Sequence, residues 1–506
     1  MRNRWTVFTL LLAVVVTLPA FLSGQSRPKV TLNPTLSPPK SPVLASGKNF
    51  LPGAHIIASL DTQQIGEALA DANGAFKNAR INIPSGISEG RHTMAFVDIS
   101  NPQNYTVLIP FTIQTNWSQR RFDSWNDANN PYEWKLDSST VTALAEAWST
   151  TVVPCPPPGG YNPKGFGTTA IIAAGIVYYN SATGGLQALD AATGTLLWTY
   201  DMTTSLGGNC GTSPTASVSP TGKGLVFVTN EQGRVYALDV STHKVVWNYD
   251  GGLGASQHHP VAYGNTIYIV NGAGDAVALN RLNGALQWSR HLDGCYAEPV
   301  AVRNGVMYFT TDNCGIQKLS SSNGQILASN SGLGGCFGVF PVASAKLAYT
   351  GGCGDPTYPI FGLNSAKLNL ALQTPNEGDP TQLALDGGQI YSVRALTSWV
   401  TNTADLCASD ATNGTPVWCL TPPGSVPFAG GEEVVANGIV YVGAVNDLIQ
   451  AVIAVDRNGN ILVQKILAGP SLDGQEPIPS AVVDGTLYVE SFASTTGEPA
   501  RLWAFR

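Results

Sequence analysis

Charged and polar side chains recur at equivalent places of a pattern that repeats along the chain. Most stand in short segments before a strand-like run, such as AEP at 297–299 and QEP at 475–477, whereas Asp312 and Arg394 stand at the end of the second strand-like run of a repeat. Carboxylates beside a histidine or an arginine can bind a cation or a polar ligand, because together they supply acceptors and donors. Six residues are therefore the candidate ligand-binding residues of this chain: His259, Glu298, Asp312, Arg394, Glu432 and Glu476.

The same spacing argues against catalysis and against a metal site. His258 and His259 are adjacent, and neighbours on a strand point to opposite faces, so at most one of them faces a shared site. Glu432 and Glu433 are adjacent too and cannot act as an acid–base pair on one face. No third metal ligand is fixed by spacing, and no nucleophile elbow is present. We predict no catalytic residue and no metal site. The alternative to ligand binding is that these groups only hydrate a channel.

The strand-like runs belong to a repeat with a period of about 40–50 residues, which is typical of propeller blades. Its clearest copies are GIVYYNSATGGLQALDAATGTLLW at 175–198, GLVFVTNEQGRVYALDVSTHKVVW at 224–247 and NTIYIVNGAGDAVALNRLNGALQW at 265–288. Each copy has an Asp or Asn eight residues before a Trp, as in Asp190 and Trp198. Asp and Asn bond to backbone N–H groups of a tight turn, and the Trp covers the outer strand against a neighbouring blade. These residues are expected to be structural.

Eight copies of the repeat are present, and the last is incomplete. It reads GTLYVESFASTTGEPARLWAF and reaches Arg506 without an outer strand, whereas VTALAEAW at 141–148 resembles such a strand. A repeat unit that is split between the two ends of an array closes a ring, as propellers require. The sequence therefore predicts an all-β protein with an eight-bladed β-propeller over residues 116–506, closed by a strand at 141–151.

The motifs ALDAATGTLLW, ALDVSTHKVVW and CASDATNGTPVW resemble the repeat of the pyrroloquinoline-quinone-type propellers. That superfamily includes quinoprotein alcohol dehydrogenases and the propeller lipoprotein of the bacterial outer-membrane assembly machine. The segment NWSQRRFDSWNDANNPYEW at 116–134 also resembles the lead-in to the first blade of such proteins. The resemblance covers residues 116–506 and implies the fold. It is poorly specific for function, because the repeat itself only builds the blade.

Two functions are compatible with this resemblance. The favoured one is an exported, non-enzymatic propeller without a cofactor, which binds a ligand, a glycan or a protein partner through its funnel or its blade edges. The alternative is a pyrroloquinoline-quinone-dependent dehydrogenase acting on an alcohol or a sugar, with quinone and calcium in the funnel and a carboxylate as base. Dehydrogenases of this family typically carry a vicinal disulfide and often a c-type haem, and this chain has neither adjacent cysteines nor C-x-x-C-H. Glu298, Asp312 and Arg394 are the remaining candidates for such a site.

Composition and the N-terminal residues favour an exported protein over a nucleic-acid binder. The net charge is −7 and no cluster of Lys and Arg occurs, whereas nucleic-acid-binding domains are usually basic. Arg2, Arg4 and the apolar run Val7–Leu18 predict a signal peptide over residues 1–25, with an uncleaved anchor as the alternative. No later apolar run is long enough to cross a membrane. We expect a monomer that is secreted, at the cell surface or periplasmic.

The residues before the propeller have a pattern of their own. Residues 28–40 are rich in Pro and Ser and predict a linker. Residues 41–115 contain short alternating runs with the hairpin signal Asn73-Gly74 between two of them. The order SGKNFLPG, DTQQIGEALADANGAF and SEGRHTMAF resembles bacterial immunoglobulin-like modules of cell-surface proteins. The resemblance implies a small β-sandwich that acts as a spacer or an adhesive unit.

Eight cysteines follow the predicted signal peptide, and an even number in an exported chain predicts disulfides. The repeat register places three pairs on adjoining strands or across one turn: Cys295 with Cys314, Cys336 with Cys353, and Cys407 with Cys419. Cys155 and Cys210 are left to pair by elimination. No C-x-x-C motif occurs, which disfavours a cysteine-bound metal.

Overall fold

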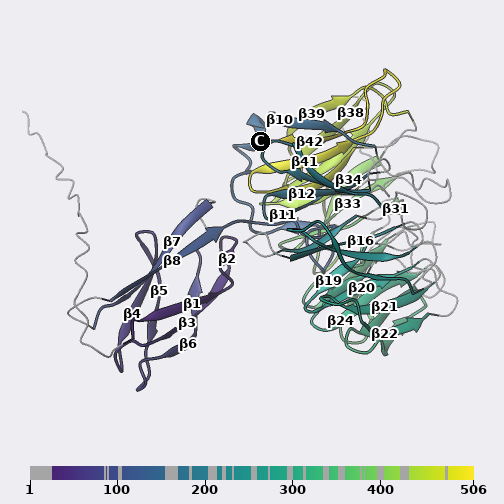
Figure 1. Ribbon diagram of the computed structural model, residues 1–506. Coiled ribbons are helices and arrows are strands. Elements are labelled where there is room, and N and C mark those ends of the chain that lie inside the picture. Colours follow the sequence, from purple (N-terminus) through teal and green to yellow (C-terminus); the bar gives the residue numbers. More distant parts are fainter. Residues whose placement is uncertain are drawn as a thin grey trace, which may run out of the picture. The chain divides into compact units, whose positions relative to one another are not determined.

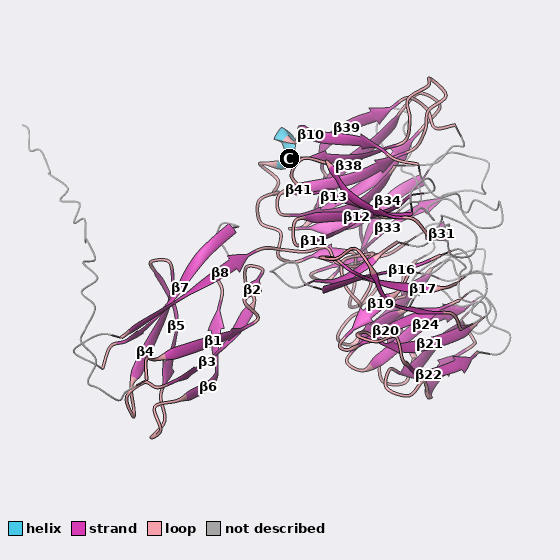
Figure 2. Cartoon of the chain, viewed as in Figure 1, coloured by secondary structure: helices cyan, strands magenta, loops and turns pink. Residues whose placement is uncertain are grey.

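The structure is a computed structural model that describes residues 26–84, 87, 90–100, 105–153, 169–181, 185–202, 213–218, 224–230, 233–251, 259–271, 274–292, 300–311, 315–333, 341–351, 359–375, 379–380, 382–395, 404–421, 432–472 and 477–506. The secondary-structure elements of its described part are β-strands apart from one short 3-10 helix, which confirms the all-β prediction (Figure 1 and Figure 2). The chain divides into two compact units, Met1–Ile113 and Gln114–Arg506. The predicted signal peptide at 1–25 lies outside the described residues. Among the residues described, no helix has the length and apolar character that a membrane span requires.

The first unit consists of two sheets around one core. One sheet contains β1 (Lys29–Asn33), β3 (Pro42–Lys48) and β6 (Phe76–Asn82). The other contains, in spatial order, β2 (Leu36–Ser37), β8 (Thr106–Ile113), β7 (Gly90–Asp98), β4 (His55–Leu60) and β5 (Gln63–Leu69). Apolar side chains of both sheets, among them Val43, Ile56 and Phe96, are buried together. Each sheet therefore has one face on the core, which explains the alternating sequence pattern.

The prediction of a linker at residues 28–40 is wrong. β1 pairs antiparallel with β3, so that Val30 lies opposite Gly47 and Leu32 lies opposite Ala45. Leu32 is buried in the core and Val30 packs against it. Burial of these two alternating apolar side chains outweighs the Pro and Ser content of the segment.

Within the described residues, the second unit forms eight sheets, each built on four antiparallel strands. The first four sheets are β11 (Ile171–Ala173), β12 (Ile176–Ser181), β13 (Gly185–Asp190) and β14 (Leu196–Tyr200); β15 (Thr215–Val218), β16 (Gly224–Thr229), β17 (Val235–Asp239) and β18 (Val245–Tyr249); β19 (Val261–Tyr263), β20 (Thr266–Val270), β21 (Asp275–Asn280) and β22 (Leu286–His291); and β23 (Ala301–Arg303), β24 (Val306–Thr311), β25 (Gly315–Ser320) and β26 (Ile326–Asn330).

The next three sheets continue this order along the chain. They are β27 (Val342–Ala343), β28 (Leu347–Gly351), β29 (Ile360–Asn364) and β30 (Leu370–Gln373); β32 (Ala384–Asp386), β33 (Gln389–Ala395), β34 (Ala404–Asp410) and β35 (Pro416–Leu420), with β31 (Asp379–Pro380) also paired to β33; and β36 (Val434–Ala436), β37 (Ile439–Val445), β38 (Gln450–Asp456) and β39 (Ile461–Ala468), with β9 (Asn129–Asn130) parallel to β36.

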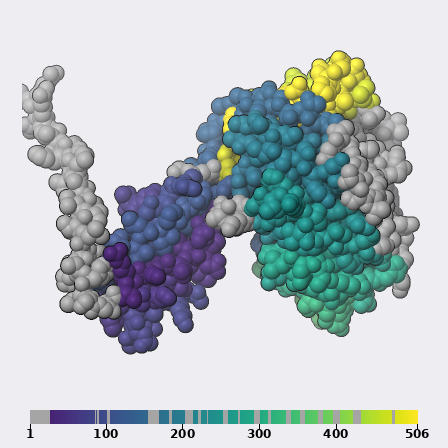
Figure 3. All heavy atoms as spheres, viewed as in Figure 1, coloured from purple at the N-terminus to yellow at the C-terminus, as the bar shows by residue number. Residues whose placement is uncertain are grey.

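The eighth sheet joins strands from both ends of the second unit. β40 (Ile478–Val483), β41 (Thr486–Ser491) and β42 (Arg501–Phe505) are followed by β10 (Glu146–Thr151), which pairs antiparallel with β42. A 3-10 helix, η1 (Val141–Ala143), leads into β10. In the space-filling view, yellow atoms of the C-terminal segment accordingly lie beside blue atoms from the start of this unit (Figure 3).

The first strands of successive sheets lie next to one another. Contacts join β11, β15, β19, β23 and β27 in that order, join β32, β36 and β40, and link β40 back to β11. These strands are short and apolar, and every residue of β11 and β36 is buried. The residues that begin the first strands therefore gather in the middle of the unit.

A tryptophan on the last strand of one sheet packs on the turn of the next sheet. Trp148 Nε1 donates to the carbonyl of Ala191 at 3.1 Å. Gly194 in that turn has φ +70°, and a Cβ there would lie 2.5 Å from the Trp148 ring. The same hydrogen bond recurs in three further pairs: Trp247 with Arg281, Trp288 with Ser321, and Trp418 with Arg457. The spacing of Asp, Gly and Trp in the repeat thus encodes a contact between neighbouring sheets.

One disulfide is present in the described part of the chain. Cys407 and Cys419 lie opposite each other on β34 and β35 and are bonded through their sulfurs. Such a link restricts the unfolded chain and contributes about 2–3 kcal/mol for a loop of this size. The other six cysteines lie outside the described residues.

Candidate functional site

A single stretch of chain, residues 117–130, contacts every sheet of the second unit and is called the belt here. Its hydrogen bonds follow the order of the sheets: Trp117 with Ile172, Ser118 with Ala216, Gln119 with Ala262, Ser124 with Val302, Trp125 with Ala343, Asp127 with Leu385, Ala128 with Val435, and Asn130 with Val482. Each partner belongs to the first strand of a sheet or to the residue beside it. The belt therefore runs around the middle of the unit and connects all eight sheets described.

The backbone of the belt is held in an unusual conformation. Four of its residues have positive φ, namely Arg121 (59°), Phe122 (75°), Asn126 (59°) and Ala128 (55°). The left-handed region costs a residue other than glycine about 1–2 kcal/mol. Asn126 Nδ2 donates to the carbonyls of Val300 at 3.1 Å and Pro341 at 3.3 Å, which fixes the bend between two sheets. Contacts with the sheets, rather than local preference, thus determine the path of the belt.

Arg120 of the belt forms a buried ion pair with Glu432, the residue two places before β36. Arg120 Nε donates to Glu432 Oε1 at 2.6 Å, and Nη2 donates to the same oxygen. The two side chains are only 4% and 2% exposed. A carboxylate this deeply buried needs such a partner, because an unpaired buried charge is costly. Glu432 is therefore neutralised by the chain itself.

Arg121 is buried beside this pair and bonds to backbone oxygens. Its Nε donates to the carbonyl of Asn126 at 3.3 Å, and Nη2 donates to the carbonyl of Leu383. Burial lowers the pKa of the guanidinium, while the nearby carboxyls of Glu432 and Glu433 act in the opposite direction. The residue thus adds a positive charge to the middle of the unit without forming a direct carboxylate bond.

Two belt aspartates add carboxyl groups to the same region. Burial raises the pKa of Asp123 to about 7, although its Oδ1 accepts the Trp125 N–H at 2.7 Å. Burial, and secondly the neighbouring Asp123, raises the pKa of Asp127 well above its usual value. Arg303, whose guanidinium lies 3.5 Å from the centre of the Trp125 ring, favours the ionised form of both aspartates.

Glu433 and Glu490 are buried acids that retain their protons near neutral pH. Burial raises the pKa of each to about 8. Glu433 Oε1 accepts the Val393 N–H at 2.6 Å. Glu490 Oε1 accepts the Ala170 N–H and the Ser480 hydroxyl, both at 3.0 Å. The middle of the unit thus contains more carboxyl groups than it can keep ionised.

The six residues predicted from the sequence separate into two groups. Glu298, Asp312 and Glu476 lie outside the described residues. His259, Arg394 and Glu432 are all buried. Arg394 donates to Ser392 Oγ at 2.8 Å and Ser409 Oγ at 3.2 Å, both within its own sheet, and burial lowers its pKa to about 10. Of these three, Glu432 has its ion pair with the belt. That the six residues form one ligand site stays a prediction.

Sequence reasoning missed Arg120, Arg121 and Glu490. The segment that contains the two arginines has no strand or helix periodicity, and Arg120 is 312 positions from its partner Glu432. Glu490 reads as a strand-end residue of the last repeat. One feature of the sequence could have indicated these residues: two adjacent arginines in a chain with few charged residues. If such arginines are buried, each needs a partner inside the protein.

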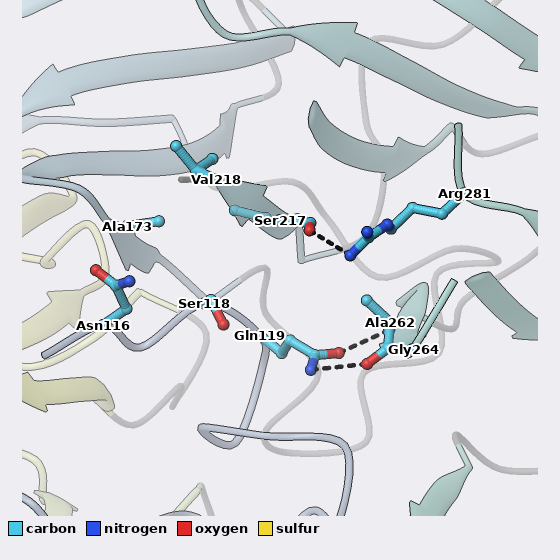
Figure 4. A pocket seen from close by; sticks show the side chains of 10 residues that line it. Asn116, Ser118, Gln119, Ala173, Ser217, Val218, Ala262, Gly264 and Arg281 are labelled. Atoms are coloured by element: carbon cyan, nitrogen blue, oxygen red, sulfur yellow. Dashed lines mark hydrogen bonds between the residues drawn. The ribbon is translucent and has the colours of Figure 1, made fainter. Parts of the chain in front are cut away.

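A cavity of about 280 Å³ lies where the start of the belt meets the first three sheets (Figure 4). It is lined by Asn116, Ser118, Gln119, Ala173, Ala216, Ser217, Val218, Ala262, Gly264 and Arg281. Arg281 Nη1 donates to Ser217 Oγ at 2.7 Å, and the amide of Gln119 bonds to both backbone groups of Ala262. No residue predicted from the sequence lines this cavity.

A quinone with calcium does not fit the described residues of the channel. Calcium sites in proteins combine carboxylate oxygens with carbonyl oxygens and waters, and Oε1 of Glu432 already accepts two hydrogen bonds from Arg120. Arg394 is held by Ser392 and Ser409 of its own sheet. The described residues also contain no group of three His, Cys, Asp or Glu side chains that could hold a metal ion. We therefore derive no chemical step through a quinone.

Comparison with known proteins finds propellers of similar fold. Residues 145–330 match the PQQ_2 family, described as outer membrane protein assembly factor BamB. A quinohaemoprotein alcohol dehydrogenase from Comamonas testosteroni is similar in structure, with 15% identity and a TM-score of 0.56 over 77% of this chain and 80% of that chain. A second one, from Pseudomonas putida HK5, has 14% identity and a TM-score of 0.55 over the same shares. A europium-containing methanol dehydrogenase has 13% identity and a TM-score of 0.56 over 77% of this chain and 98% of that chain.

No curated protein sequence is significantly similar to the chain. At these identities, the likeness to the solved structures concerns the fold and not the activity. Together with the family match over residues 145–330 and the repeat of four-stranded sheets, it shows that this chain carries a β-propeller similar in fold to the pyrroloquinoline-quinone-type propellers.

Proposed function

We propose that the chain is an exported, non-enzymatic propeller of eight blades that binds a protein partner along the outer edges of its blades. The contact of β40 with β11 and the pairing of β10 with β42 support a closed ring. The two sheets of the first unit support an immunoglobulin-like spacer. Export is supported by the signal-like residues 1–25 and by the Cys407–Cys419 disulfide, since disulfides persist in oxidising compartments.

The observation that carries this proposal is the surface of the outer strands. The last strands of seven sheets expose aliphatic side chains: Leu196 and Leu197 on β14, Val246 on β18, Leu286 on β22, Ile326 and Leu327 on β26, Leu370 on β30, Val417 on β35, and Ile466 on β39. These side chains are between 39% and 64% exposed. Each of these strands is the edge of its sheet, and an edge with apolar side chains can pair with a strand of another protein.

The interior of the unit supports a binding role rather than catalysis. The described acids in the middle are ion-paired, as Glu432 is, or retain their protons, as Glu433 and Glu490 do. A general base must be ionised and within reach of a substrate, and none of these three groups is exposed to one. A glycan or small ligand at the open part of the funnel is the alternative to a protein partner.

Photocrosslinking tests the proposed partner site. A photoreactive residue at Leu197 or Val246 is expected to capture a protein in cells of the native host, because these side chains lie on exposed strand edges. The same residue at Leu448, which is 73% exposed but lies between β37 and β38, is the matched control. Equal capture at Leu448, or no capture at the outer strands, would contradict the proposal.

Calorimetric titration with pyrroloquinoline quinone, with and without calcium, tests the dehydrogenase alternative. We expect no binding, because the Glu432 carboxylate is already neutralised by Arg120 and Arg394 is held by two serines. Calcium-dependent binding of one quinone per chain would overturn the non-enzymatic assignment and justify assays with alcohols and sugars.

A further inference from the structure

Arg281 lines the cavity beside the belt; its backbone is held by hydrogen bonds, and its guanidinium bonds only to neutral acceptors. The Arg281 N–H donates to the carbonyl of Asn265 at 2.9 Å, and its own carbonyl accepts from Trp247 Nε1 at 3.0 Å. Its side chain donates to Ser217 Oγ at 2.7 Å and to Asn265 Oδ1 at 3.4 Å. Both acceptors are neutral, and among the described residues no carboxylate lies within ion-pair distance of Arg281.

Three other arginines in the second unit do lie near a carboxylate. Arg120 is paired with Glu432, Arg234 with Asp250, and Arg457 lies 3.9 Å from Asp386. Arg281 instead lines a cavity whose described walls contain no acidic residue. The net charge of this site is therefore positive in a protein whose overall net charge is −7.

The remaining polar groups of the cavity are chiefly donors. Asn116 Oδ1 accepts the Ala174 N–H at 3.0 Å, which leaves the Asn116 amide nitrogen as a donor. Gln119 uses both ends of its amide on Ala262, at 2.8 and 3.1 Å. Ser118 adds a hydroxyl to the lining. Figure 4 shows these side chains placed around one space, with Arg281 extending toward Ser217 from the opposite side.

Charge and size together select the ligand class. One guanidinium matches a singly charged carboxylate, which it can bind through two parallel N–H bonds, whereas a doubly charged phosphate would keep an unmatched charge. The volume of about 280 Å³ is at the lower limit for ligand pockets and suits a small molecule. Ala173, Val218 and Ala262 offer apolar contact to a carbon skeleton, and the serine hydroxyls and Asn116 can bond to hydroxyl groups.

We propose that this cavity binds a small hydroxylated carboxylic acid, such as a sugar acid, with its carboxylate on Arg281. The inference rests on the cavity alone and does not depend on a protein partner at the blade edges. The site is formed by the belt and by residues of the first three sheets, so an occupied cavity also strengthens the contact between them. Binding is therefore expected to raise the unfolding temperature of the full chain.

The test is calorimetric titration of the full chain with D-glucuronate and D-gluconate at concentrations up to a few millimolar. The methyl ester of glucuronate serves as the uncharged counterpart. We expect a carboxylate to bind and the ester to bind about tenfold or more weakly, because a charge-assisted hydrogen bond is lost. Equal binding of the ester, or no binding of either acid, would overturn the proposal. Tighter binding of inorganic phosphate, or of a peptide through its terminal carboxylate, would also overturn it.

Two variants separate recognition from folding. Arg281→Gln is expected to weaken binding of the acid about ten- to hundredfold, and Arg281→Lys is expected to weaken it less, because the charge is kept and the paired geometry is lost. Arg290→Gln is the matched control, since Arg290 is exposed on β22 of the same sheet. Unfolding temperatures without ligand report whether each variant folds. Unchanged affinity in a folded Arg281→Gln variant would remove Arg281 from the site.

Discussion

Replacing Glu432 by glutamine is expected to lower the free energy of unfolding by about 3–5 kcal/mol. The substitution removes the carboxylate that neutralises Arg120, although both side chains are almost fully buried. A buried guanidinium without its carboxylate partner is costly, because its charge is then uncompensated. Urea denaturation, followed by tryptophan fluorescence, measures the change.

A double-mutant cycle shows whether the loss comes from the ion pair. Arg120→Met alone should also destabilise the protein, whereas the double variant should be more stable than the two single losses predict. The control is Asp250→Asn, which breaks the pair of Arg234 and Asp250. That pair is 18% and 55% exposed, so its loss should cost less than about 1 kcal/mol. If Glu432→Gln and Asp250→Asn lower the free energy of unfolding equally, burial does not determine how much an ion pair contributes to the stability of this protein.

The propeller sheets could be predicted because each one repeats a local pattern. Strand alternation, the turn with Asp190 and Gly194, and the tryptophan eight residues after the aspartate lie within one short segment of sequence. The truncated last repeat led to an expected outer strand near 141–148, and the structure has β10 at Glu146–Thr151 beside β42. The residues of one repeat were sufficient to predict its sheet, because most hydrogen bonds of a blade join strands of that same blade.

The belt and the cavity could not be predicted in the same way. The belt has no periodicity and depends on bonds to strands that lie up to about 350 residues away in the chain, as for Asn130 and Val482. The cavity is lined largely by small side chains, such as Ala173, Ala216 and Gly264, which do not stand out in a sequence. Arg281 lines a cavity only because residues of three sheets meet around it in the folded protein. The linker predicted at residues 28–40 is a strand because the alternating side chains of Val30 and Leu32 pack against the core, and the Pro and Ser content does not show this.

The stability of the protein is expected to fall as the pH rises from about 5 to about 8. Burial raises the pKa of Asp123 to about 7 and the pKa of Glu433 and Glu490 to about 8. In the unfolded chain these acids lose their protons near pH 4. Between pH 4 and pH 7–8 the folded protein therefore holds more protons than the unfolded chain, and raising the pH favours unfolding. Each such group contributes at most about 1.4 kcal/mol per pH unit.

At lower pH, other carboxylates make the stability of the protein rise with pH. Hydrogen bonds from Ser139 and Thr140 lower the pKa of Asp137 to about 2, and bonds within turns also lower the pKa of Asp410. Their contribution is present above the unfolded value near pH 4 and is lost as the pH falls through the folded value. It is small, because both residues are partly exposed to solvent, which weakens such interactions. Maximum stability is therefore expected near pH 4–5, and urea denaturation across this range measures it.

Glu490→Gln is the variant that assigns this pH dependence to a residue. The amide keeps an oxygen for the Ala170 N–H and the Ser480 hydroxyl, yet it cannot ionise at any pH. We expect a shallower decline between pH 5 and 8, by up to about 1.4 kcal/mol per pH unit, and a variant more stable than the parent at pH 8. Glu146→Gln, at an exposed position of β10, controls for the change in overall charge. An unchanged slope in Glu490→Gln would mean that Glu490 is already ionised in the folded protein.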